Sequence, residues 1–150
     1  MIAEEFGKII AAGGFGTLID NATLTTTGWV VSVEVIGDGI YNQAGVSHIL
    51  VRDESHIPKS QAIRVDEYYT RLLFYANDIN DAKIKGEEVL KYFDNRTEME
   101  TADNRTIMVC QISENLLIEN VYQAENNLKE VAGATVKLTV SNQVASTGRT

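Results

Sequence analysis

The sequence predicts an α+β fold in which two helices pack on one face of a mixed or antiparallel sheet. Three segments carry this prediction: an amphipathic helix pattern at residues 2–12, a strand leading into a helix at residues 68–93, and an alternating strand at residues 134–141. The other strand patterns are grouped around the two helices, which is typical of this fold class. We expect one domain over residues 1–141 and a polar tail over residues 142–150.

The first half of the segment at residues 68–93 has the sequence YYTRLLFYA and alternates between two faces. This alternation predicts a buried strand. One face carries Thr70, Leu72, Phe74 and Ala76. The opposite face carries Tyr69, Arg71, Leu73 and Tyr75. We place the core at this strand and the helix that follows it.

After the polar pair Asn77-Asp78, the pattern changes to the period of a helix. Small or apolar residues recur at steps of three and four, which places them in one stripe on the helix. These residues are Ile79, Ala82, Gly86, Val89 and Phe93. The carboxylate of Asp78 is expected to cap the first turn. Lys83 and Glu87 are expected to form an ion pair on the exposed side.

The N-terminal part predicts a helix followed by extended segments. The helix at residues 2–12 is expected to end at the glycine pair that follows it. The threonine-rich stretch at residues 16–28 is expected to be extended. The strands at residues 29–36 and 46–52 are expected to pair as a hairpin, with a turn at residues 37–39.

Polar connectors are expected at residues 53–66, 94–105 and 125–133. Between the last two, residues 107–112 predict a strand, and residues 116–124 predict either another strand or its continuation after a bend. The first connector is the longest and holds the single proline. Loops of this length inside a compact domain are usually functional or disordered.

The chain carries 13 basic and 21 acidic residues, a net charge of −8. This balance argues against a surface that binds the phosphate backbone of nucleic acid, although an acidic wall suits a channel through which DNA passes. The single cysteine, Cys110, lies in an apolar run and is expected in the core. Neither a signal peptide nor an apolar run long enough to span a membrane is found. We therefore expect a soluble intracellular protein with no membrane partner.

No segment carries a recognisable catalytic or cofactor-binding motif. The glycines within residues 13–16 lack the lysine of a phosphate-binding loop and follow a helix instead of a strand. His48 and His56 have no further histidine or cysteine at the spacing of a zinc site. We expect no catalytic residue, no cofactor and no metal, and therefore no enzymatic activity.

The order and lengths of these elements resemble a known family. A short N-terminal helix leads to strands and an irregular loop, and a long strand then ends in the step from Phe74 to Asp78. A helix with Ala82 in its first turn, a further strand and a closing hairpin follow. This arrangement resembles the tail terminator proteins of long-tailed bacteriophages, also called tail completion or minor tail proteins, over roughly residues 2–140.

The resemblance implies a tail-terminator-like fold and a structural protein of the virion, assembled in the host cytoplasm and located at the tail and neck. Members of the family form a hexameric ring that stops growth of the tail tube. The ring docks onto the neck proteins, and DNA passes through its lumen without specific binding. The implied partners are further copies of this chain, the tail tube protein and the neck or connector proteins.

In such a ring, the sheet can extend across subunits by edge-strand pairing. The polar connectors at residues 53–66 and 125–133 project from the expected sheet and can contact neighbouring molecules. We expect the interacting side chains among Asp53, Glu54, His56, Lys59, Arg64, Asp66, Glu125, Lys129 and Glu130.

Two other functions fit the same observations. A small α+β enzyme or ligand-binding domain would carry its site at residues 53–66, where Asp53, His56 and Asp66 would converge on a pocket. Such a protein would be a monomer or a dimer. A tail tube subunit, or another neck protein of related fold, would also match, and a tube subunit would polymerise into long tubes.

Overall fold

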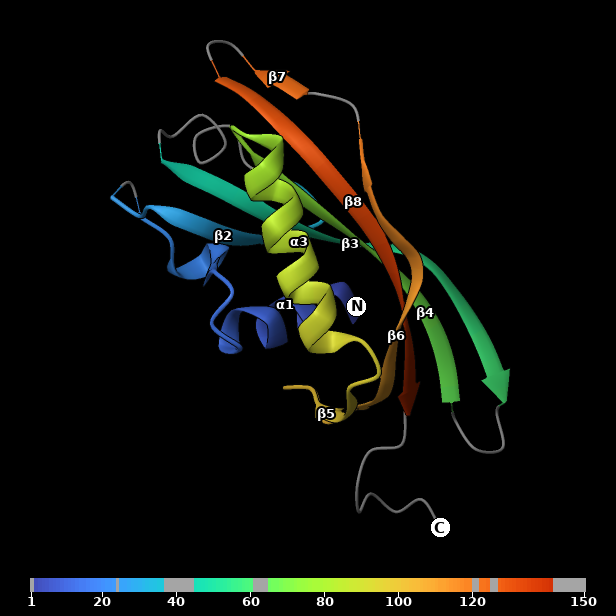
Figure 1. Ribbon diagram of the computed structural model, residues 1–150. Helices are drawn as coiled ribbons and strands as arrows, with labels where there is room; N and C mark the ends of the chain where they lie inside the picture. Colours follow the sequence, from blue (N-terminus) through green and yellow to red (C-terminus); the bar gives the residue numbers. More distant parts are fainter. Residues whose placement is uncertain are drawn as a thin grey trace.

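The computed structural model describes residues 2–23, 25–36, 45–60, 65–119, 122–124 and 127–141 (Figure 1). In these residues, one curved mixed sheet wraps around two α-helices, α1 (Ile2–Ala12) and α3 (Ile79–Phe93). The strand order is β1-β2-β3-β4-β8-β6-β5, and β7 pairs with β8. The prediction of a mixed sheet combined with helices is therefore confirmed.

The sheet has two parallel pairs at one side, β1 with β2 and β2 with β3, and the other pairs in the described chain are antiparallel. A short 3-10 helix, η1 (Ile19–Asn21), follows the first strand. The strands are β1 (Thr17–Leu18), β2 (Gly28–Val33), β3 (Val46–Ser60), β4 (Val65–Ala76), β5 (Thr97–Glu100), β6 (Thr106–Ile118), β7 (Tyr122–Ala124) and β8 (Asn127–Ser141).

The core lies between the helices and one face of the sheet. Phe6 of α1 and Phe93 of α3 meet edge to face, with ring centroids 5.2 Å apart. From β4, the core receives Thr70, Leu72, Phe74 and Ala76, which are all buried. From β8, it receives Ala132, Ala134, Val136, Leu138 and Val140. The alternation predicted for residues 68–76 and 134–141 is confirmed, and the structure shows which face of each strand lies against the helices.

α1 ends and α3 begins as predicted, but one expected ion pair on α3 is absent. Gly14 follows α1 with φ 88°, a conformation that favours glycine and ends the helix. The Asp78 carboxylate accepts a hydrogen bond from Asn80 N (2.8 Å) and caps α3. Lys85, not Lys83, pairs with a glutamate on α3, and its Nζ also lies 5.5 Å from the centre of the Trp29 ring. An exposed i,i+4 pair contributes only about 0.3–0.5 kcal/mol, so the absence of the Lys83–Glu87 pair costs the fold little.

The predicted hairpin of residues 29–36 and 46–52 is wrong, because β2 and β3 run parallel, from Gly28 opposite Val46 to Val33 opposite Val51. Parallel neighbours require the chain to return to the same end of the sheet, which a tight turn cannot do. Both strands have nearly continuous apolar sequences, which indicate burial on two faces and leave the direction of pairing open. The expected turn at residues 37–39 lies outside the described residues.

Residues 53–66 are mostly strand, and the prediction of a connector there is wrong. β3 continues to Ser60 and β4 begins at Val65, so this polar stretch lengthens the hairpin between them. Register shifts between Asp53 and Ser55, and between Pro58 and Ser60, mark irregularities in the ladder. The polar sequence is that of an edge strand, which carries charged residues and tolerates proline.

The structure also bears on four other segments whose conformation the sequence left open or predicted differently. The polar stretch at residues 125–133 belongs largely to β8, and β7 pairs with its beginning. Both alternatives for residues 116–124 hold in part. Residues up to Ile118 continue β6 after register shifts, and Tyr122–Ala124 form the separate short strand β7. The connector at residues 94–105 contains β5, and the stretch at residues 16–28 is interrupted by η1.

On the sheet face opposite the helices, Arg71 of β4 connects to the two strands beyond it. Its Nη1 donates to Thr135 Oγ1 of β8 (3.1 Å) and to Glu114 Oε1 of β6 (3.3 Å), and its Nη2 pairs with Glu119. Gly133 lies beneath this network, since a Cβ there would be 2.6 Å from Glu119 Oε1 and 2.9 Å from Arg71 Nη2. The ion pair can therefore cross β8 only where no side chain intervenes.

We expect Gly133→Ala to lower the free energy of unfolding by about 1–3 kcal/mol, because the new methyl group must displace the ion pair or Leu73. Urea denaturation of the purified variant measures this loss. Glu119→Ala removes one of the obstructing atoms, so the same glycine substitution should cost less in that background. Equal costs in both backgrounds would contradict the assigned contact.

Candidate functional site

The outer part of the β3–β4 hairpin holds the most closely associated of the predicted interaction residues. His56 Nε2 lies 3.3 Å from Asp66 Oδ2, and the His56 ring stacks on the Tyr68 ring with centroids 4.3 Å apart. Arg105 Nη1 donates to Tyr68 Oη (3.4 Å). This arrangement joins an exposed imidazole to a carboxylate and to an aromatic ring, and these contacts hold the two strands of the hairpin together.

Asp53 faces a different group of residues, at the N-terminus of α1. Its Oδ1 accepts a hydrogen bond from Ala3 N (3.1 Å), and its own amide donates to Glu34 Oε1 (3.0 Å). Burial raises the pKa of Asp53 above its ordinary value, and the neighbouring Glu34 carboxylate raises it further. Asp53 therefore holds α1 against the sheet, while Glu54 beside it is exposed.

Of the remaining predicted residues, those whose side chains are described are not gathered at one place. Lys59 lies in β3, and nothing is described of its side chain; Arg64 and Glu125 lie outside the described residues. Glu130 is half-buried and lies opposite Ala76. The prediction of a surface role for Lys129 is wrong, because its side chain is buried and its Nζ donates to Val46 O (3.0 Å) and Asn77 Oδ1 (3.2 Å).

Lys129 therefore connects the start of β8 to the start of β3 and to the turn before α3. Burial lowers the pKa of Lys129, which fits an ammonium group held by neutral oxygens. The sequence concealed this role because the segment NLKEVAG is as polar as an exposed loop.

We expect Lys129→Met to destabilise the fold by about 1–3 kcal/mol, since Val46 O and Asn77 Oδ1 each lose a donor. Thermal or urea denaturation checks this, with Lys83→Met, at an exposed lysine of α3, as the matched control. An unchanged free energy of unfolding would contradict the buried position of Lys129 and its two hydrogen bonds.

A second polar group, which the sequence did not indicate, ties the turn at residues 101–105 to α1. Ala102 N donates to Glu5 Oε1 (2.8 Å), and Arg105 Nη2 donates to Asp103 Oδ2 (2.7 Å). Thr101 Oγ1 also donates to Asp103 Oδ1. These bonds, led by that from Arg105, lower the pKa of Asp103 from 3.8 to about 2.

Because the folded protein binds the Asp103 proton more weakly than the unfolded chain does, Asp103 stabilises the fold above its ordinary pKa. This contribution is lost as the pH falls through about 2. We expect Asp103→Asn to be less stable than the wild type at pH 5 and the difference to shrink towards pH 2. Urea denaturation across this range measures it, with Asp20→Asn at an exposed carboxylate as the control. A difference independent of pH would contradict the pairing.

Besides the outer edges of the short strands β1 and β5, two of the long strands have open stretches of edge in the described chain. β2 covers β3 as far as Val51, whose carbonyl accepts from Glu34 N (2.9 Å). Beyond Asp53, β3 has β4 on one side and no described strand on the other. Similarly, β6 is covered as far as Cys110, whose amide donates to Arg96 O (2.9 Å). From residue 113 to Ile118, its described neighbour is β8 alone.

The two open edges are on opposite sides of the sheet and at opposite ends of it. The open half of β3 aligns, through Tyr68 of β4 and Leu138 of β8, with the covered part of β6 at Cys110. The open half of β6 aligns through β8 and β4 with the covered half of β3. These two stretches on the long strands therefore differ from each other, and each one is capable of accepting a strand.

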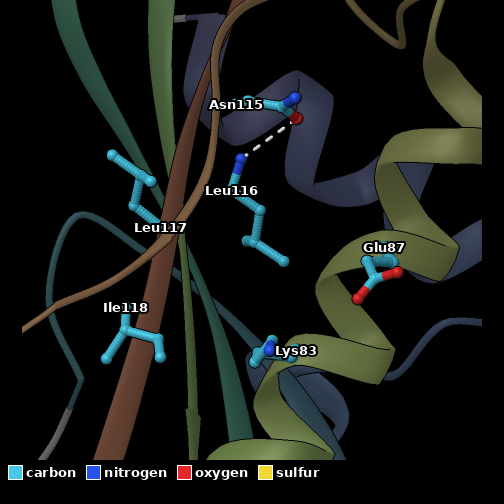
Figure 2. Close-up of a pocket in the computed structure, with 6 residues that line it drawn as sticks. All are labelled: Lys83, Glu87, Asn115, Leu116, Leu117 and Ile118. Atoms are coloured by element: carbon cyan, nitrogen blue, oxygen red, sulfur yellow. Dashed lines mark hydrogen bonds between the residues drawn. The ribbon is translucent and has the colours of Figure 1, made fainter.

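A groove of about 450 Å³ runs beside the open half of β6 (Figure 2). Lys83 and Glu87 of α3 form one wall, and residues 115–118 of β6 form the other. In Figure 2, Leu116 points towards α3, while Leu117 points away from it. Leu117 and Ile118 are 69% and 62% exposed, which is unusual for large apolar residues that lie next to each other.

The thiol of the single cysteine is not available as a nucleophile. Cys110 is buried, and this burial raises its pKa to about 12, so the sulfur stays protonated. Among the described residues, no three acidic, histidine or cysteine side chains are grouped as a metal site. Neither of the described α-helices combines the length and apolar character needed to cross a membrane.

Comparison of the sequence with protein-family models and with curated proteins finds no match. The open edges and the groove are therefore the features from which a function can be argued. Sequence reasoning identified the strand at residues 116–118 but not its exposure. The adjacent apolar residues in NLLI were the available signal.

Proposed function

We propose that this protein is a structural subunit that assembles head to tail into a closed ring. The proposed role is that of the phage tail terminators, in which the ring caps the tail tube and joins it to the neck. The observation that carries the proposal is the pair of unlike open edges, on β3 and on β6. Two unlike surfaces lead to head-to-tail association, which closes into a ring when the rotation between copies permits.

The directions of the strands favour this association. β3, β4, β8 and β6 are joined by three successive antiparallel pairs, so β6 runs antiparallel to β3 within one molecule. When a second copy lies beside the first in the same orientation, its β3 runs antiparallel to the β6 that it meets. The new pair then has the same hydrogen-bond geometry as the three antiparallel pairs around it.

The charge of the chain is consistent with a conduit for DNA. Each copy contributes a net charge of −8, so a ring would repel phosphate groups and leave the DNA free to move. The localisation that follows from this proposal is the tail and neck of a virion, and the ring size is the hexamer of the family that the sequence resembles.

The alternative of an enzyme or ligand-binding site at residues 53–66 has less support. It requires Asp53, His56 and Asp66 to converge, and only His56 and Asp66 are paired. Asp53 instead bonds to Ala3 at the N-terminus of α1. A tube subunit would also self-assemble, but its copies would form a long tube instead of a closed ring. Electron micrographs distinguish these two assemblies.

Size-exclusion chromatography with light scattering tests the proposal, followed by negative-stain images of the protein alone and mixed with phage tails. We expect a mass of several subunits, images of rings, and rings at the ends of tails. Moderate salt should favour assembly, since it screens repulsion between acidic copies. A monomer at every concentration and salt, in the absence and presence of tails, would contradict the proposal.

A further inference from the structure

We infer that the groove between α3 and β6 receives the open edge of β3 from the next copy of this chain. This inference rests on the proposed self-assembly and specifies the two surfaces that meet. The acceptor consists of residues 113–118 of β6 with Lys83 and Glu87 of α3. The donor consists of β3 beyond Asp53.

Along β6, amide groups at the acceptor edge and immediately before it have local side chains as partners. Ile112 N donates to Asp94 Oδ1 (3.3 Å), and Leu116 N donates to Asn115 Oδ1 (3.1 Å), as Figure 2 shows for the second. In the proposed interface, the added strand replaces these side chains as the hydrogen-bond acceptors. The backbone of an added strand supplies carbonyl oxygens at these positions.

The acceptor is also held in place before any partner arrives. Leu116 packs on Gly86 of α3, where a Cβ would be only 2.8 Å from Leu116 Cδ1. On the other face, Glu114 bonds to Arg71 and Thr135. The open half of β6 is therefore fixed to both α3 and the sheet, so an added strand need not order it at the cost of entropy.

The donor edge is exposed because β2 turns away from β3. Glu34, immediately after β2, has φ 68°, and its carboxylate accepts the hydrogen bond of the Asp53 amide. Beyond this point Ser55 and Ile57 lie opposite Tyr69 and Glu67, on the sheet face away from the helices. Ile57 is 45% exposed there.

The faces of the two edges match. Leu117 lies opposite Gly133, which in turn lies opposite Leu73, so Leu117 also projects from the face away from the helices. In a continuous sheet, Ile57 and Leu117 therefore lie on the same side and can cover each other. A second copy explains the apolar exposure at both edges at once, and the donor's Glu54 and His56 offer counterparts for Lys83 and Glu87 of the wall.

Cross-linking between single-cysteine positions tests this inference. Ile57→Cys and Leu117→Cys chains are mixed and treated with a short bismaleimide, and Ser55→Cys replaces Ile57→Cys to detect a register shifted by two residues. The buried Cys110, with its pKa near 12, does not compete. We expect cross-linked dimers in the mixture, and a ladder ending at the ring size when one chain carries both the Ile57→Cys and the Leu117→Cys substitutions.

Ile84→Cys is the control, because Ile84 is 63% exposed on α3 but does not line the groove. It should give no cross-link with the donor positions. Cross-linking of Leu117→Cys to itself would overturn the inference, since it would show that β6 pairs with β6. So would the lack of any link to Ser55→Cys or Ile57→Cys in a sample that light scattering shows to be oligomeric.

A charge placed in the interface gives an independent readout. We expect Leu117→Asp to raise the concentration at half assembly by about tenfold or more, with the monomer still folded because the site is exposed. Ile84→Asp should leave assembly unchanged. Assembly of Leu117→Asp at wild-type concentrations would overturn the assignment of this surface while leaving self-assembly intact; a monomeric wild type would instead remove the proposed function itself.

Discussion

The pairing of β4 with β8 is the constraint on which the remaining structure depends. All 12 residues of β4 lie opposite residues of β8, from Val65 at Ser141 to Ala76 at Glu130. This long register decides which side chains of both strands face the helices and which face away. It also sets where β3 and β6 can pair on either side, and therefore where each of them is left uncovered.

The parts of the fold that the sequence predicted are those with a local period. The alternation at Thr70, Leu72 and Phe74 and the helical stripe from Ala82 to Phe93 each depend on burial of one face, so neighbouring residues carry the information. The parallel pairing of β2 with β3 depends on how the chain returns between them, and no pattern within either strand records it.

The candidate site was harder to predict, for two physical reasons. Polar sequence does not distinguish an exposed loop from an edge strand, so residues 53–60 were expected in a connector although they extend β3. A polar residue in the sequence also gives no sign that it is buried when its partner comes from a distant segment. Lys129, which bonds to Val46 and Asn77, is the example. Leu117 and Ile118 present the converse case, because two large apolar residues are exposed along an open edge and their sequence does not indicate it.

The central claim is that two unlike edges of one molecule become a single seam between copies. Amide hydrogen exchange at increasing protein concentration detects the pairing of these edges directly, since unpaired edge amides exchange quickly and paired ones slowly. The account predicts that residues 54–57 and 113–118 gain protection together as the protein assembles, while the amides of β4 and β8 do not change. Assembly without protection of these segments, or protection of one segment alone, would contradict it.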